Sequence, residues 1–377
     1  MRIAFGILFF FSVLFPKAQN LVPNPSFEDY TACPIGNKFD MLTYWCGLAG
    51  GEDAFNACNN PLNPGADGVP YSQIAGFQYA RTGVGIGSVF IYGPPVSGYP
   101  PNRREYLKVP LISTLVQGKK YCGTMYVNVY NESMVCTDRA GIYITNSNLN
   151  CNQAFPMPQY IAPLNVTPQI QNPPGQLITD TLNWIEVSGT FTAVGNEQYL
   201  YIGNFYDDAN TYTVTTYPTS LMNWNYLMID DVSLEEVHDA QCTNDTTLCN
   251  PDSILLGNNV SEAAEYAWSP STGLSCTTCP NPKAYINQTI TYTLTKKQCK
   301  VTSMDYVTVT LKNDCGLVDI PNVFTPNEDG INDAFRVTLP VGYSFADFVV
   351  YNRWGNVIFK PESISKTTLF WDGHTTS

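Results

Sequence analysis

Carboxylates are the chain's main candidates for chemistry, because residues that serve other hydrolytic mechanisms are scarce. The sequence contains two histidines, His238 and His374, which disfavours nucleophile relays that need a histidine and zinc sites built from several histidines. Glycoside hydrolysis instead needs two carboxylates, and Glu105, Glu186 and Glu197 are candidates. Nothing around them selects a pair, so we expect no catalytic residue and keep a carbohydrate-active enzyme, a glycosidase or lyase, as the alternative.

The charge balance excludes one large class of partner. The 377 residues include 19 Lys and Arg against 32 Asp and Glu, which gives a formal net charge of −13. Such a chain lacks the basic field that attracts phosphate backbones, so nucleic-acid binding is not expected. Only 14% of the residues are charged and 13% are aromatic, which is typical of β-rich exported proteins.

The first 18 residues have the features of a secretory signal peptide. Arg2 precedes an apolar run over residues 3–15, and the small Ala18 suits the position before a cleavage site. The apolar run is shorter than the roughly 20 residues that a membrane-spanning helix needs. No later stretch is uniformly apolar, so we expect no transmembrane segment and a secreted mature protein that starts near Gln19.

Twelve cysteines in an exported chain predict disulfides. Six lie in each half of the chain, and most of their pairings stay open. The Cys276–Cys279 motif has no second such motif to complete a zinc site and lies in a Ser/Thr/Pro-rich turn, so we interpret it as a structural disulfide. Cys249 and Cys299 are expected to pair, because a bond between the ends of separate strands would close a long loop.

Alternating apolar and polar residues, broken by Gly, Pro and Asn, predict an all-β chain. The clearest strands are expected at residues 120–130, 140–145, 184–193, 198–205 and 226–235. A break near residues 238–242 is followed by short, evenly spaced strands, and a further unit begins near residue 317. The predicted organisation is therefore a signal peptide (1–18) and three β domains (19–237, 238–316 and 317–377).

Strand phase separates core positions from candidate ligand contacts. Side chains alternate between the two faces of a strand, so the apolar set Met125, Val127 and Val129 predicts a core face. Aromatic rings beside amides on the other face suit sugar recognition, since rings cover C–H faces and polar groups bind hydroxyls. Loops that cover these rings would close the face instead. The candidate ligand-binding residues are Tyr126, Asn128, Tyr130, Tyr143 and Trp184.

The first long segment resembles the jelly rolls of carbohydrate-binding modules. The resemblance is carried by the opening Asn24-Pro25-Ser26-Phe27-Glu28, the closing Ile229-Asp230-Asp231-Val232-Ser233-Leu234, and blocks such as Arg104-Glu105-Tyr106-Leu107. It implies a β-sandwich, and in this family a structural calcium often lies where the first and last strands meet. Glu28 and Asp230 are the matching carboxylates, with Asp231 as the alternative if a bulge shifts the strand phase. Backbone N–H groups or water could cap the same carboxylates without a metal.

The middle segment resembles the Ig-like or PKD-like modules that space out secreted bacterial proteins. The residues that carry this resemblance are Trp268-Ser269-Pro270, Gly273-Leu274, Thr291-Tyr292-Thr293-Leu294 and Val307-Thr308-Val309. It implies a small Ig-like sandwich, and no cluster of catalytic side chains is found in it.

Three ordered blocks at the end of the chain resemble the gliding-motility-associated C-terminal domain, the type B sorting signal of type IX secretion in Bacteroidota. They run from Ile320 to Phe335, from Val350 to Phe359, and through Trp371-Asp372-Gly373. The resemblance implies that the type IX secretion machinery recognises residues 317–377. Family members continue past the third block, which implies an incomplete domain here. Trp354 and Phe359 are expected in its core, and the Asn327–Asp333 segment is expected to form an Asx/Gly turn.

Together these features predict a secreted or cell-surface binding protein without catalytic activity. Its partners are the secretion machinery and an extracellular glycan or surface protein.

Overall fold

The structure is a computed structural model of the whole chain. It describes residues 19–34, 39–59, 68–73, 75–95, 99–151, 160–216, 223–249, 252–258, 264–312, 318, 320–340, 343–361, 364 and 368–374. The predicted signal peptide, residues 1–18, lies outside the described residues.

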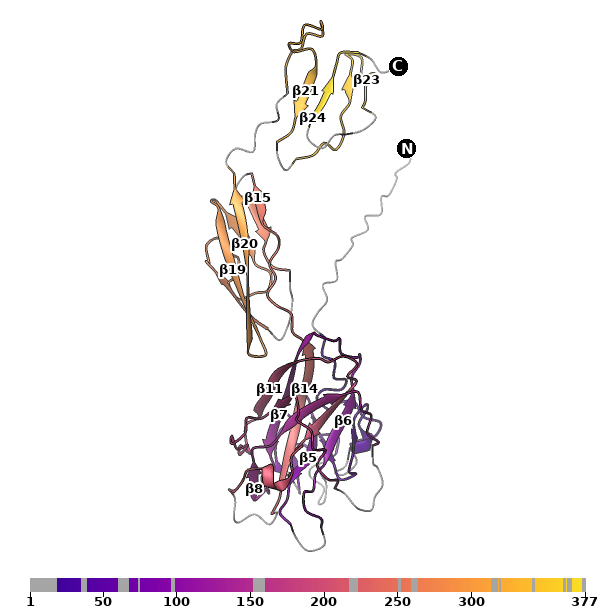
Figure 1. Cartoon of the computed structure of the whole chain (residues 1–377), viewed down its shortest axis with the longest axis vertical. Coiled ribbons are helices and arrows are strands. Elements are labelled where there is room, and N and C mark those ends of the chain that lie inside the picture. Colours follow the sequence, from indigo (N-terminus) through magenta and orange to yellow (C-terminus); the bar gives the residue numbers. More distant parts are fainter. Residues whose placement is uncertain are drawn as a thin grey trace. The chain divides into compact units, whose positions relative to one another are not determined.

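Almost all regular structure in the described chain is β, which confirms the predicted fold class (Figure 1). Two short 3₁₀ turns, η1 (Phe39–Met41) and η2 (Asp208–Asn210), interrupt the strands. The strands up to residue 145 are β1 (Cys46–Gly47), β2 (Asp53–Asn56), β3 (Tyr71–Ser72), β4 (Gly76–Phe77), β5 (Gly85–Tyr92), β6 (Tyr106–Pro110), β7 (Lys120–Val129), β8 (Val135–Thr137) and β9 (Gly141–Thr145). The next are β10 (Ile170–Gln171), β11 (Ile185–Thr192), β12 (Tyr199–Gly203), β13 (Thr213–Thr215), β14 (Asn225–Glu236), β15 (Thr246–Leu248), β16 (Asp252–Leu255) and β17 (Ala264–Ser269). The last are β18 (Lys283–Ile286), β19 (Ile290–Gln298), β20 (Val301–Leu311), β21 (Phe335–Thr338), β22 (Val350–Tyr351), β23 (Val357–Phe359) and β24 (Thr368–Trp371).

The chain divides into two compact units. The first comprises residues 1–240, 259–267 and 295–304, so it includes the tip of the β19–β20 hairpin. The second comprises residues 241–258, 268–294 and 305–377. No helix among the described residues is long and apolar enough to cross a membrane.

A β-sandwich forms the first unit. One five-stranded sheet has the order β1-β6-β12-β9-β10, and the other has the order β11-β7-β14-β5-β2. Their facing sides bury one hydrophobic core, to which Met125, Val127 and Val129 of β7 contribute as predicted. The core is continuous across both sheets, because Ile142 of β9 and Leu200 of β12 pack in the same cluster.

The opposite face of the second sheet carries its own cluster. Tyr130 packs there with Phe55 of β2 and Met228 of β14, and Val69 and Ala75 from the β3–β4 region complete the cluster. This region therefore covers part of the face on which the sequence placed candidate ligand contacts.

The second unit contains β15, β16, β18 and the C-terminal strands. Trp268, at the boundary of the two units, is buried and donates its indole N–H to the Cys279 carbonyl at 3.0 Å. Near the C-terminus β21 pairs with β24 and β22 with β23, both antiparallel.

The C-terminal segment corrects one prediction and shows the expected turn. Asn327 Oδ1 accepts a hydrogen bond from the Asp329 N–H at 3.3 Å, and Asp329 Oδ1 accepts from the Ile331 N–H at 2.8 Å, each from two residues further on, as an Asx turn requires. Trp354, expected in the core, is 77% exposed, because it lies in the tight turn that Asn352 and Gly355 close before β23. Phe359 is half-buried and packs against Phe348 and Trp371.

The disulfides correct another prediction. Cys299 bonds Cys122, so the expected Cys249–Cys299 pair is wrong, although Cys249 is itself disulfide-bonded. Cys299 lies at the tip of the β19–β20 hairpin, and residues 295–304 of this hairpin belong to the first unit, where Cys122 of β7 is its partner. The Cys276–Cys279 disulfide is confirmed. Further bonds join Cys33 to Cys58 and Cys46 to Cys151, and Cys136 and Cys242 are free and buried.

Candidate functional site

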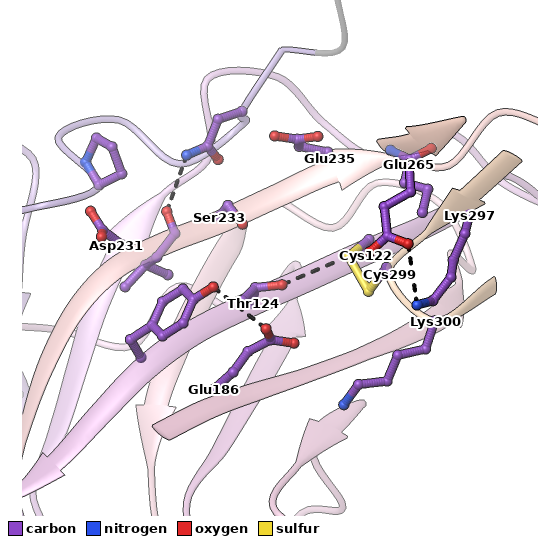
Figure 2. A pocket seen from close by; sticks show the side chains of 15 residues that line it. Cys122, Thr124, Glu186, Asp231, Ser233, Glu235, Glu265, Lys297, Cys299 and Lys300 are labelled. Atoms are coloured by element: carbon purple, nitrogen blue, oxygen red, sulfur yellow. Dashed lines mark hydrogen bonds and ion pairs between the residues drawn. A yellow bond between two sulfur atoms is a disulfide. The ribbon is translucent and has the colours of Figure 1, made fainter. Parts of the chain in front are cut away.

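A cavity of about 570 Å³ lies in the first unit, on the side of the second sheet that faces away from the sandwich core. Its floor comes from β7, β11 and β14, and its wall comes from the β19–β20 hairpin tip (Figure 2). Among the lining residues are Thr124, Tyr126, Glu186, Asp231, Ser233 and Gln298.

Strand register brings the floor residues together. In the antiparallel pairs Tyr126 of β7 lies opposite Glu186 of β11 and Asp230 of β14, and Thr124 lies opposite Ser233. Tyr126 donates its hydroxyl to Glu186 Oε2 at 3.5 Å. One phenolic ring is therefore bordered by carboxylate and hydroxyl groups on both neighbouring strands.

Two left-handed residues shape the wall. Cys299 and Lys300 have φ values of 50° and 65° and form the two-residue turn of the hairpin. Non-glycine residues adopt this conformation at a cost, which surrounding structure must offset. The Cys122–Cys299 disulfide fixes the turn on β7, with a Cα–Cα distance of 5.8 Å, and Lys296 Nζ donates to the His238 carbonyl at 2.8 Å.

The polar groups of the wall are only partly paired. Lys297 Nζ lies 3.5 Å from Glu265 Oε2, an exposed ion pair. Gln298 is 2% exposed, and its Nε2 donates to the Glu236 carbonyl at 3.4 Å. Its Oε1 is buried and has no hydrogen-bond partner among the described residues. A buried acceptor without a partner costs about 1–3 kcal/mol.

Glu28 and Asp230, the predicted calcium ligands, accept hydrogen bonds from the protein itself. Glu28 Oε1 accepts from the backbone N–H groups of Val84 and Gly85 at 2.8 and 2.7 Å. Asp230 Oδ2 accepts from the Arg81 and Thr82 N–H groups at 2.7 and 3.3 Å. The Asp231 N–H also donates to Asp230 Oδ1 at 2.7 Å, so both oxygens of Asp230 accept hydrogen bonds from the protein.

Asp230 is buried beside a second carboxylate, Asp231. Burial raises its pKa to about 7, with a further increase from the Asp231 charge, and the backbone hydrogen bonds oppose this rise. No group of three Asp, Glu, His or Cys side chains in the described part of the chain is arranged to hold a metal. The residues do not fit a calcium ion in this arrangement.

The five residues that were predicted to contact a ligand do not form one site in the structure. Tyr126 lines the cavity, whereas Asn128 and Tyr130 are buried on the same face, and Asn128 Nδ2 donates to the Asn183 carbonyl at 3.0 Å. Trp184 is half-buried beside them and donates to the Tyr79 carbonyl at 3.3 Å. Tyr143 belongs to the other sheet and packs near Tyr201 and Phe205.

The three carboxylates considered for catalysis also lie in different environments. Glu186 lines the cavity. Glu105 is buried, and Glu197 accepts from the Val194 and Gly195 N–H groups, both at 2.8 Å. Sequence patterns identified neither Arg81 nor the residues of the cavity wall. The Cys122–Cys299 disulfide brings the wall to β7, and the sequence leaves the pairing of these distant cysteines open.

Comparison with known proteins gives weak likenesses for the fold. The K2 cleaved adhesin domain of Lys-gingipain is 11% identical with a TM-score of 0.28, covering 57% of this chain and 96% of that one. The K1 domain of Lys-gingipain from Porphyromonas gingivalis is 15% identical with a TM-score of 0.25 and the same coverage. The CBM22-1–GH10 modules of Clostridium thermocellum endo-1,4-beta-D-xylanase 10B, complexed with xylohexaose, are 13% identical with a TM-score of 0.26, covering 59% of this chain and 34% of that one. At such low TM-scores these likenesses carry no argument.

Sequence comparison is informative for the C-terminus. A search of curated proteins finds no match to the chain. Residues 318–377, which include the turn at Asn327 and the strands β21–β24, match the CHU_C Type IX secretion signal domain. Because such a signal directs export, the chain is a secreted protein located at the cell surface or outside the cell.

Proposed function

We propose that this exported chain is a non-catalytic binding protein that binds a glycan in the cavity beside Tyr126. The observation that carries the proposal is the position of this ring, with polar side chains of β11 and β14 on either side and the hairpin wall beside it.

The chemistry of the cavity suits a sugar. A half-buried phenol offers a flat surface for sugar C–H groups, and Glu186, Thr124 and Ser233 can exchange hydrogen bonds with hydroxyls. A volume of about 570 Å³ falls within the common range for small-molecule sites.

A non-catalytic role is supported by the separation of the candidate carboxylates. Of the three, only Glu186 lines the cavity, and Ser188 Oγ donates to its Oε1 at 2.5 Å. Glycoside cleavage would need a second carboxyl at a defined distance across the bound sugar, and two other carboxyls that line the cavity, Asp231 and Glu265, are in ion pairs with Arg81 and Lys297.

Glycan-array binding with the purified chain tests the proposal, followed by titration of the best ligand against Tyr126→Ala. We expect the substitution to weaken binding by about tenfold or more, as loss of a stacking ring does. Tyr212→Ala is the control, because Tyr212 is an exposed tyrosine of the same unit outside the cavity. Equal losses in both variants, or no array signal, would contradict the proposal, and cleaved products would favour the enzyme alternative.

A further inference from the structure

The junction between the start of the sandwich and β14 brings two consecutive carboxylates, Asp230 and Asp231, next to the segment that begins at Arg81. β14 carries an irregularity between Asp230 and Ser233, and Asp231 has a left-handed φ of 48°. The bulge lets both consecutive carboxylates accept hydrogen bonds from the segment that begins at Arg81.

One short segment supplies most of the donors. Arg81 and Thr82 donate their backbone N–H groups to Asp230, and the Arg81 guanidinium and Thr82 hydroxyl donate to Asp231. Ser26 Oγ also donates to Asp231, at 2.5 Å. These bonds join the opening of the chain to a strand some 200 residues later.

Arg81 is the positive charge of this network. Its guanidinium forms an ion pair with Asp231, whose side chain is 16% exposed, and hydrogen bonds between charged groups are stronger than those between neutral groups.

The same guanidinium reaches the cavity. Its central carbon lies 3.4 Å from the centroid of the Tyr126 ring, so a cation–π contact fixes the ring that lines the site. One face of the ring is thereby occupied by Arg81.

We propose that Arg81 takes the place of a bound cation at this junction: its guanidinium pairs with Asp231, its backbone N–H binds Asp230, and its side chain positions Tyr126. The sandwich is then stable without calcium. This inference is independent of the glycan proposal, because its readout is thermal stability without any ligand.

Melting of the full chain with excess EDTA, and then with millimolar calcium chloride, tests the proposal. We expect the wild-type melting temperature to be the same in both. Arg81→Ala should lower it by about 4–8 °C, through loss of charge-assisted hydrogen bonds. Calcium should restore part of that loss in the variant alone, because the variant leaves the carboxylates without their cation.

Arg139→Ala is the matched control, since Arg139 also stacks on a tyrosine, Tyr206, and pairs with an aspartate, Asp138, away from the bulge. Its melting should not respond to calcium. A wild-type protein that EDTA destabilises, an Arg81→Ala variant that melts like the wild type, or one that calcium leaves unchanged would each overturn the proposal.

Discussion

Cys122 and Cys299 are joined across 177 residues of sequence, and their disulfide fixes the hairpin wall of the cavity on β7. Because the bond restricts so long a loop, chain entropy alone would give it about 5 kcal/mol of stabilisation. Replacing both cysteines with serine should therefore lower the melting temperature and increase hydrogen exchange in residues 295–304.

The Cys276–Cys279 bond provides the control for this experiment. This disulfide spans three residues, so it restricts the unfolded chain far less than Cys122–Cys299 does. Its removal should leave exchange in residues 295–304 unchanged. If both double variants lose protection there equally, the Cys122–Cys299 bond does not hold the wall.

Gln298→Leu separates ligand binding from stability. The substitution keeps the volume and removes the buried Oε1 that has no partner among the described residues, at the expense of one long hydrogen bond of 3.4 Å. We expect the melting temperature to stay constant or rise, because an unsatisfied buried group costs about 1–3 kcal/mol. Glycan affinity, measured by calorimetric titration, should be unchanged, because Oε1 is not exposed to the cavity. A stability loss with unchanged affinity would place the role of Gln298 in folding.

Glu105→Gln should make the protein more stable at neutral pH. Burial raises the pKa of Glu105 well above its usual range, and the charges of Glu52 and Asp53 raise it further. Phe90 N–H donates to Glu105 Oε2 at 2.9 Å, an acceptor that the glutamine carbonyl can reproduce. The substituted amide therefore resembles the protonated side chain.

The sign of the pH effect follows from linkage. With the folded pKa above the unfolded one, the unfolded chain releases this proton first, so the stability contribution present below about pH 4 is lost as pH rises. The difference in melting temperature between Glu105→Gln and wild type should therefore grow as pH rises above about 4. A difference that stays constant as pH rises would show that Glu105 is ionised in the folded protein.

The alternation of apolar and polar residues predicted the sandwich, but not which side chains on its outer face are buried. The phase of Val127 and Val129 depends only on alternation within one strand, and both are core residues. Tyr130 has the opposite phase, as predicted, yet it is 2% exposed, because Val69 and Ala75 pack over it. This coverage depends on residues about 60 positions away in the sequence, and alternation within one strand gives no information about them.

Chemical type also failed to place residues whose partners are distant in sequence. Six cysteines in each half gave no reason to prefer a bond between the halves, such as Cys122–Cys299. Asp230 was expected to need a cation or several hydrogen-bond donors; it is buried, and it lies opposite Tyr126 on the outer face of the sheet. The donors that satisfy it, at Arg81 and Thr82, come from a loop whose path the sequence does not specify.

Trp354 provides a last test, at the C-terminal signal domain. Its exposed side chain contacts Arg353, with 5.3 Å from the guanidinium carbon to the ring centroid, and buries little apolar surface. Trp354→Ala should change the unfolding free energy by no more than about 0.5 kcal/mol. Leu369→Ala is the comparison, because Leu369 on β24 is 6% exposed, and truncating a buried leucine costs about 2–5 kcal/mol. Hydrogen exchange of β21 and β24 in the full chain measures both effects. Strong loss of protection in Trp354→Ala would show that the tryptophan packs in the domain core after all.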